Sequence, residues 1–341
     1  MRVTILLAVL AGGALGFVLT RGDFCFHSTW RRLFAQPAET SLVRAYVVLL
    51  LVATPVVQVF IGTGFIDPFI PGFSPRAAVV GGAVFGAGMV IARTCISGMF
   101  YKLGAGMLGM VVAIIGWAIG DIVTWRGPLK GLREWFNENP ITHTASDGTE
   151  QAATVTSALG PFGAACVIAI AIGLGAWVAR DEAVSVPSHD LLTGRAPKLG
   201  GVRLGVAAGL VMVIAWVLVR WHGFDYSYGT SGVPSTIWTW ATYDADVAWW
   251  IPLALLSVIP GALVAAVAGN TFLARGEEPK RYLELASGAL VMGVGAGIAG
   301  GCNLGHSMVG VPLLSIGSIV TTVAIVGGVF VADRIARMLA H

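Results

Sequence analysis

Long apolar segments alternate with short polar ones along almost the whole chain. Windows of about 20 apolar residues, the length that a helix needs to cross about 30 Å of hydrocarbon, occur nine times. They cover residues 3–20, 41–63, 76–92, 104–124, 158–179, 200–219, 246–268, 284–300 and 312–332. The pieces 23–36, 93–103, 225–243 and 301–311 are too short to span and are predicted to be short or re-entrant helices.

Composition excludes a soluble protein. Of 341 residues, 21 are Lys or Arg and 18 are Asp or Glu, which makes 11% charged against about 25% in soluble domains. With 56% hydrophobic residues, the chain has too few polar side chains for a water-facing surface, so we expect an all-α membrane protein in contact with the lipid bilayer. The small net charge of +3 indicates no nucleic-acid partner.

Charge in the loops predicts the orientation. Fifteen of the 21 Lys and Arg residues fall in alternate loops on one side, and six fall on the other: Arg2, Arg76, Arg126, Lys130, Arg133 and Arg220. By the positive-inside rule the N-terminus is outside and the C-terminus cytoplasmic. The longest loop, residues 125–157, is then external, and its Trp125, Trp135 and Phe136 indicate an amphipathic piece at the membrane interface.

The two halves of the chain match at an offset of 207 residues. The segment F-G-A-G-M-V-I-A-R-T-C-I-S-G (85–98) aligns without a gap with M-G-V-G-A-G-I-A-G-G-C-N-L-G (292–305). Five spans separate equivalent elements, so the second copy is inverted, as in many transporters with broken helices at a central site. We expect a single membrane domain with a first repeat over 1–124, the external loop 125–157 and an inverted repeat over 200–332. Residues 1–20 could also be a cleaved secretory signal, but the repeat makes that span structural.

Three of the four cysteines lie where a span ends and a short helix is predicted to begin. They occur in R-G-D-F-C-F-H (21–27), A-R-T-C-I-S-G (92–98) and G-G-C-N-L-G-H (300–306). The N-termini of broken helices carry unpaired N–H groups and partial positive charge, so they attract anions. Each cysteine could be a thiolate nucleophile or ligand, a neutral thiol in a constriction, or a packing residue. Cys166 lies in an uninterrupted apolar stretch and is predicted to pack.

Other polar residues near these breaks have two interpretations each. His27 and His306 could act as bases for the thiols, but a structural, hydrogen-bonded role is commoner. Arg93 either attracts anions or adds to the positive-inside charge. Asp121 is placed near the external end of its span, where a carboxylate can reach water and take part in proton coupling. Asp23 is expected to be a helix N-cap.

Four motifs together resemble the YeeE/YedE family of membrane proteins, the thiosulfate transporters of bacterial inner membranes. They are R-G-D-F-C-F, the glycine-rich run into T-C-I-S-G, Y-G-T-S-G at 228–232, and A-G-G-C-N-L-G-H-S-M-V-G-V-P at 299–312. The resemblance runs from residue 21 to the last span and does not include residues 125–157. One departure is Arg93-Thr94, where the family usually has Gly-Gly, which affects the expected pore width and substrate.

The resemblance implies an hourglass-shaped transporter without enzymatic activity, cofactor or metal. It implies that Cys25, Cys95 and Cys302 pass thiosulfate inward through successive S–H contacts, and that a TusA-like cytoplasmic sulfur carrier is a partner, which this chain ends too soon to carry as a fusion. The candidate pore-lining residues are Gly22, Phe24, Arg93, Thr94, Ser97, Gly98, Gly229, Ser231, Gly232, Asn303, Gly305 and His306.

Two alternatives remain open. The first is transport of another sulfur species, such as sulfite, or of a selenium compound. The second is a membrane thiol-disulfide oxidoreductase, which needs cysteines whose Cα atoms lie within about 7 Å and usually a vicinal pair. The sequence contains no C-x-x-C pair, so it disfavours that reading. Channel-like and proton-coupled movement are both compatible with the sequence.

Overall fold

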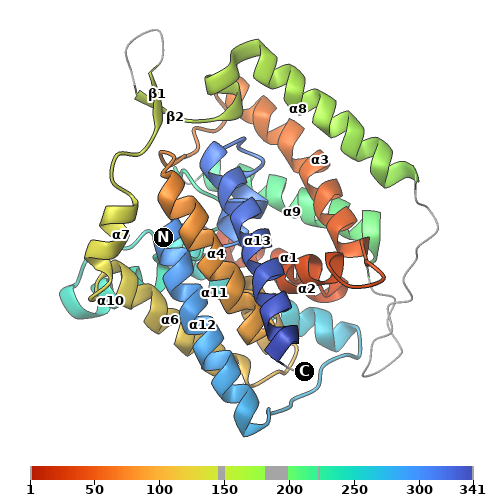
Figure 1. The fold of residues 1–341 in the computed structure, drawn as a ribbon, viewed down its shortest axis with the longest axis vertical. Coiled ribbons are helices and arrows are strands. Elements are labelled where there is room, and N and C mark those ends of the chain that lie inside the picture. Colours follow the sequence, from red (N-terminus) through yellow and green to blue (C-terminus); the bar gives the residue numbers. More distant parts are fainter. Residues whose placement is uncertain (1, 145–149, 181–198, 222, 340–341) are drawn as a thin grey trace.

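The computed structural model describes residues 2–144, 150–180, 199–221 and 223–339 and is a bundle of helices (Figure 1). The α-helices are α1 Arg2–Gly22, α2 Phe26–Leu33, α3 Ser41–Gly62, α4 Pro75–Ala92, α5 Ile96–Gly104, α6 Met110–Trp125, α7 Lys130–Phe136, α8 Val155–Arg180, α9 Gly201–Trp221, α10 Val233–Tyr243, α11 Trp250–Ala268, α12 Pro279–Ala299 and α13 Ile316–Leu339. One π-helix, η1, covers Leu304–Gly310, and two short strands, β1 Thr142–Thr144 and β2 Glu150–Ala152, pair antiparallel.

The protein is an all-α, multi-span membrane protein. In the described part of the chain, eight stretches are long and apolar enough to cross a membrane, and α6 with α7, bent by 71° at their junction, makes a ninth. The predicted short pieces are also present, as α2, α5, α10 and η1. The predicted span 104–124 began too early, because residues 105–109 form a turn whose Met107 bridges to Arg275, and the helix starts at Met110.

Loops gather at two ends of the bundle. At one end, which we call the α7 end, Phe73 bridges to Ile141 and Thr154 bridges to Ser315, so the loops after α3, α7 and η1 meet there. At the opposite end, the α13 end, α13 finishes and the turns around Met107 and Arg275 meet. The β-hairpin of the predicted external loop was not foreseen, and its residues 145–149 lie outside the described residues.

Glycines set the closest contacts between α4 and α12, which run side by side through the centre of Figure 1. On α4, a side chain at Gly81 would collide with the backbone nitrogen of Ala299. On α12, a side chain at Gly288 would collide with the backbone nitrogen of Ala92. The two contacts are related by the repeat offset, because Gly288 lies 207 positions after Gly81 and Ala299 lies 207 positions after Ala92. The backbones can approach this closely only because glycine has no Cβ.

The other helix pairs follow the same reciprocal plan. The pair α12 with α6 is matched by α4 with α13, and α1 with α11 is matched by α9 with α3. The short helices agree, because α10 packs on α6 as α2 packs on α13. Such reciprocity is what a duplicated and inverted chain would give, so it supports the repeat, whose boundaries stay a prediction.

Helix α8 lies at the edge of the bundle, along α3 (Figure 1). It carries Cys166, which is partly exposed. In the described part of α8 only Gly163 is buried, so most of its apolar side chains face outward. Cys166 therefore lies on a different element from the other three cysteines, six residues after a backbone kink at Gly160, and its packing role stays a prediction.

Candidate functional site

The three predicted helix breaks share one backbone pattern. Each cysteine stands two positions after a residue with left-handed backbone geometry, which ends the preceding helix. The pairs are Asp23 (φ 46°) with Cys25, Arg93 (φ 50°) with Cys95, and Gly300 (φ 80°) with Cys302. The cysteines at the first two breaks are the N-cap residues of α2 and α5. The chain therefore turns at each break so that a thiol lies at the start of the next short element.

The breaks after α1 and α4 bring Cys25 and Cys95 together. Their Sγ atoms lie 3.5 Å apart, and both side chains are buried. The thiol of Cys95 accepts a hydrogen bond from the Gly98 N–H at 3.3 Å and lies 3.3 Å from the Ser97 hydroxyl. A Cβ at Gly98 would lie 3.1 Å from the Cys25 Sγ, so glycine leaves room beside the thiols. We call Cys25 and Cys95 the thiol pair.

The thiol pair corrects one expectation. The sequence disfavoured a dithiol because no cysteines are near one another along the chain, yet residues 70 positions apart meet in space. One geometric requirement of disulfide chemistry, proximity of the sulfurs, is therefore met at this site. This observation does not choose between relay and redox chemistry, because both need neighbouring thiols.

Arg93 and Thr94, which replace the Gly-Gly of the resemblance, point in different directions. The Arg93 side chain is 60% exposed and pairs with Glu284 at 3.3 Å, away from the thiol pair. Thr94 is buried, and its hydroxyl lies 4.0 Å from the Cys25 Sγ. That hydroxyl accepts a hydrogen bond from the Lys102 Nζ at 3.2 Å. Of the two replacements, Thr94 is the one that changes the surroundings of the thiols.

Asp23 does not cap α2, contrary to the expectation. Cys25 occupies the N-cap position, and the Asp23 carboxylate accepts a hydrogen bond from the Tyr101 hydroxyl at 3.0 Å. This bond joins the break after α1 to α5 beside the thiol pair. Asp23 therefore links the break after α1 to α5, which follows the break after α4, through a bond between residues 78 positions apart.

The break after α12 places Cys302 beside α4. Its Sγ accepts a hydrogen bond from the Leu304 N–H at 3.2 Å, and the side chain is 1% exposed. The next residue, Asn303, donates through its Nδ2 to the Sδ of Met89 at 3.1 Å. Met89 lies on the last turn of α4, which leads directly into the break that holds Cys95. The Cys302 loop and the thiol pair are therefore linked through α4.

The π-helix η1 is held by hydrogen bonds from several elements. His306 contacts the Ser318 hydroxyl through Nδ1 at 3.0 Å and the Ala299 carbonyl through Nε2 at 3.2 Å. Both ring nitrogens are thus occupied, which supports the structural interpretation of His306 over the catalytic one. The Gly305 carbonyl accepts a hydrogen bond from the Tyr226 hydroxyl at 3.0 Å.

Asp121 is a helix cap and does not reach water, which corrects its predicted exposure. Its carboxylate is fully buried and accepts hydrogen bonds from the Gly232 N–H at 2.8 Å and the Ser235 N–H at 3.1 Å. The Ser235 hydroxyl is a third donor, at 2.5 Å. A carboxylate at a helix N-terminus is stabilised by these N–H groups and by the helix dipole. The start of α10 is therefore already occupied by a carboxyl group of this chain.

The remaining residues of the Y-G-T-S-G motif line the approach to α10. The Ser231 hydroxyl donates to the Ala296 carbonyl at 3.0 Å, and Gly229 lies near Ile251 without a close contact. Thr230 is buried, and its hydroxyl lies beside the Cys302 thiol. This hydroxyl is the polar side-chain group next to the third cysteine.

Two predicted lining residues pack in other ways. A side chain at Gly22 would collide with Leu204 of α9, so Gly22 serves helix packing. Phe24 is buried with its ring centroid 5.2 Å from that of Phe26, in an aromatic cluster on α2. Neither position donates a polar group to the thiols.

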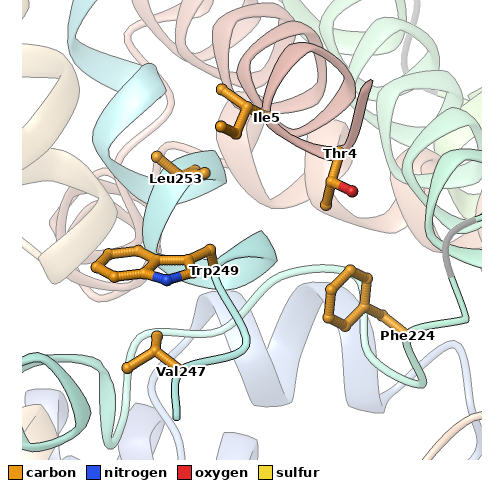
Figure 2. A pocket seen from close by; sticks show the side chains of 6 residues that line it. All are labelled: Thr4, Ile5, Phe224, Val247, Trp249 and Leu253. Atoms are coloured by element: carbon orange, nitrogen blue, oxygen red, sulfur yellow. The ribbon is translucent and has the colours of Figure 1, made fainter. Parts of the chain in front are cut away.

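A cavity of about 420 Å³ lies elsewhere, near the N-termini of α1 and α11 (Figure 2). Its lining residues are Thr4, Ile5, Phe224, Val247, Trp249 and Leu253. None of them is a candidate site residue, so the cavity and the cysteines are separate features. Among the described residues, no group of three or more His, Cys, Asp and Glu side chains could hold a metal ion.

Sequence reasoning missed Lys102 and Thr230. Lys102 was counted only as a positive-inside charge, although it follows Cys95 by seven residues, which is two helical turns. Side chains on a helix lean toward its N-terminus, so a lysine at this spacing can reach back to the break. Thr230 stood inside a quoted motif, but only the tertiary structure brings it to Cys302.

Comparison with known proteins agrees with this architecture. The family model described as sulphur transport matches residues 21–331. A protein named thiosulfate transporter TsuA from Spirochaeta thermophila is 27% identical over 325 residues, covering 91% of this chain and 92% of the relative. The Escherichia coli protein of the same name is 25% identical over 319 residues, covering 89% and 87%. Escherichia coli also has a protein named probable transporter YedE, 28% identical over 117 residues, which cover 34% of this chain and 28% of that protein. With broken helices, buried thiols and a family match over most of its length, the chain belongs to the sulphur transport (YeeE/YedE) family of membrane transporters.

Proposed function

We propose that this transporter imports thiosulfate by way of Cys302 and the thiol pair. The observation that carries the proposal is the burial of three thiols at three helix breaks of the same backbone pattern, two of which bring their sulfurs within 3.5 Å. Relatives of nearly the same length are named thiosulfate transporters, which supports this substrate.

The chemistry suits a small divalent anion. Moving an uncompensated dianion into hydrocarbon costs tens of kcal/mol by order of magnitude, so hydrogen-bond donors are needed along the path. The starts of α2 and α5 and the Cys302 loop supply N–H groups, and neutral thiols are weak donors. Weak binding at several stations lets the anion leave as readily as it enters. The thiols then act as relay stations and undergo no net covalent change.

The proposed route runs from the α7 end to the α13 end. The excess of Lys and Arg in the loops at the α13 end favours a cytoplasmic α13 end and an external α7 end, and we propose a bacterial inner membrane as the location. Thiosulfate would meet Cys302 first and then the thiol pair, because Cys302 follows the end of α12 that faces the α7 end. The hydrogen bond from Asn303 to Met89 supports direct passage between these stations. We propose a TusA-like sulfur carrier as the partner that binds at the cytoplasmic side.

Alanine substitutions at each cysteine test the proposal. Cys25→Ala, Cys95→Ala and Cys302→Ala should each lower uptake of radiolabelled thiosulfate into cells that lack other routes for this anion. Cys166→Ala is the matched control and should take up thiosulfate as the parent does, because α8 lies at the edge of the bundle. Membrane abundance of each variant is measured in parallel. Full uptake by all three variants would refute the relay.

Competition defines the cargo. Unlabelled thiosulfate, sulfite, sulfate and selenite are added to vesicles during uptake of labelled thiosulfate. Stronger inhibition by one of the other anions than by thiosulfate would reassign the substrate.

Co-purification of a TusA-like protein with the parent chain, and its loss at high salt, tests the partner.

A further inference from the structure

Lys102 places an unpaired positive charge close to the thiol pair. It lies on the last turn of α5, and in the described part of the chain its ammonium group makes no ion pair with a carboxylate. Other cations are ion-paired: Arg31 pairs with Asp333 at 2.9 Å, and Arg281 pairs with Glu284 at 3.0 Å, although each of these carboxylates also contacts a second arginine. The charge of Lys102 is therefore available to a ligand.

Thr94 holds this charge toward the thiols. The Lys102 Nζ donates to the Thr94 hydroxyl at 3.2 Å, and that hydroxyl lies 4.0 Å from the Cys25 Sγ. Thr94 and Cys25 are both 0% exposed, so the hydroxyl and the thiol are shielded from bulk solvent, while Lys102 is half-buried. Electrostatic attraction is stronger in such surroundings than in water.

A buried imidazole without a partner faces the same region. The Nε2 of His27 has no hydrogen-bond partner among the described residues, and the side chain is 5% exposed. His27 lies in the first turn of α2, two residues after Cys25. An unpaired polar atom in a buried site is costly unless a ligand or water satisfies it. This atom is a second and independent sign of a ligand position beside Cys25.

We propose that Lys102, held by Thr94 and flanked by His27, forms an anion station that favours doubly charged sulfur oxyanions over singly charged ones. The proposal rests on the proposed function and assigns the charge selectivity of that path. At equal distance a unit charge attracts a dianion twice as strongly as a monoanion. The thiols alone carry no such preference, because neutral S–H groups discriminate little between charges.

Methanethiosulfonate is the matched probe, because it is thiosulfate with one charged oxygen replaced by a methyl group. The two unlabelled anions compete with radiolabelled thiosulfate for uptake into vesicles that contain the full-length protein. The quantity measured is the selectivity ratio, which is the inhibition constant of methanethiosulfonate divided by that of thiosulfate. For Lys102→Gln, inhibition by thiosulfate should weaken about tenfold and inhibition by methanethiosulfonate about threefold, so the ratio falls about threefold.

Three further variants separate selectivity from folding. Lys102→Arg keeps the charge and should keep the ratio. Arg32→Gln also removes one cation, but that side chain pairs with Glu39 on the exposed face of α2, so the ratio should not change. Thr94→Val keeps the side-chain shape and the lysine but removes the hydroxyl that holds the ammonium group near the thiols. The ratio should therefore fall, as it does for Lys102→Gln. This variant decides the matter if Lys102→Gln does not accumulate in the membrane.

An unchanged ratio in both Lys102→Gln and Thr94→Val would refute the proposed anion station. A fall of the ratio in the control Arg32→Gln as large as that in Lys102→Gln would also refute it. Absence of thiosulfate uptake by the parent protein would instead refute the proposed function. The two failures are therefore distinguishable within one set of measurements.

Discussion

Replacing Asp121 with alanine should loosen the start of α10 far more than an ordinary surface change would. The substitution removes the acceptor of three hydrogen bonds, from the Gly232 N–H, the Ser235 N–H and the Ser235 hydroxyl. Asp121 is 0% exposed, so water cannot replace the carboxylate unless the segment moves. The donors are then left unpaired, or α10 separates from α6.

The size of the effect follows from these contacts. A hydrogen bond to a charged group contributes about 1.5–3 kcal/mol. Partial solvation of the freed donors offsets some of the sum for three bonds, so the opening free energy of this segment should fall by about 3 kcal/mol. That corresponds to about a hundredfold faster exchange of the protected amides, at about 1.4 kcal/mol for each factor of ten. Asp121→Asn keeps one oxygen acceptor and should give about a tenfold change.

Hydrogen exchange measured by mass spectrometry in lipid nanodiscs checks this prediction, on peptides that cover residues 226–243. Glu134→Ala is the control, because Glu134 lies on α7, is 56% exposed and pairs with Lys130 at 3.6 Å. An exposed pair of this kind contributes little, so exchange in α10 should not change. If Asp121→Ala leaves exchange in α10 unaltered, or if Glu134→Ala has the same effect, the capping role of Asp121 is wrong.

Two other predictions follow from close contacts. Gly288→Val should reduce the amount of folded protein in the membrane and its thermal stability in detergent, because its Cβ would meet the backbone of α4, whereas Gly327→Val should be tolerated, because no atom lies within 4 Å of a Cβ there. Diamide should link Cys25 to Cys95, whose sulfurs are 3.5 Å apart, in a bond detected by mass spectrometry of unreduced peptides. Links formed mainly from either residue to Cys302 would contradict that arrangement.

The spans could be predicted from the sequence because hydrocarbon demands about 20 apolar residues for each crossing helix. The start of α6 could not, because Leu108 and the residues around it are apolar enough for a helix, and only the bridge between Met107 and Arg275 shows that they form a turn. The breaks before Cys95 and Cys302 were visible because glycine, alanine and cysteine recur in register.

Contacts between distant residues explain what the sequence could not reveal. Nothing in the spacing of Cys25 and Cys95, 70 residues apart, indicates that their thiols touch. Asp121 was expected near water because it lies near the external end of its span, and its partners, Gly232 and Ser235, lie more than a hundred residues away along the chain. A carboxylate in an apolar span has the same sequence signal whether it faces water or caps a helix. Only the second environment supplies N–H donors from another segment.

The reciprocal glycine contacts between α4 and α12 have the form of an interface in a two-fold symmetric dimer. In such an interface, each partner offers the same surface to the other, so that one contact occurs twice. Gly81 against Ala299 and Gly288 against Ala92 are one contact of this kind, written twice within a single chain. A half-length ancestor that inserted into the membrane in both orientations would have made this contact with a second copy of itself. Fusion of two copies would then have freed each half to change alone. The break at Cys25 in the first half corresponds to one at Gly232 in the second, whose N–H donates to the Asp121 carboxyl group of the first half.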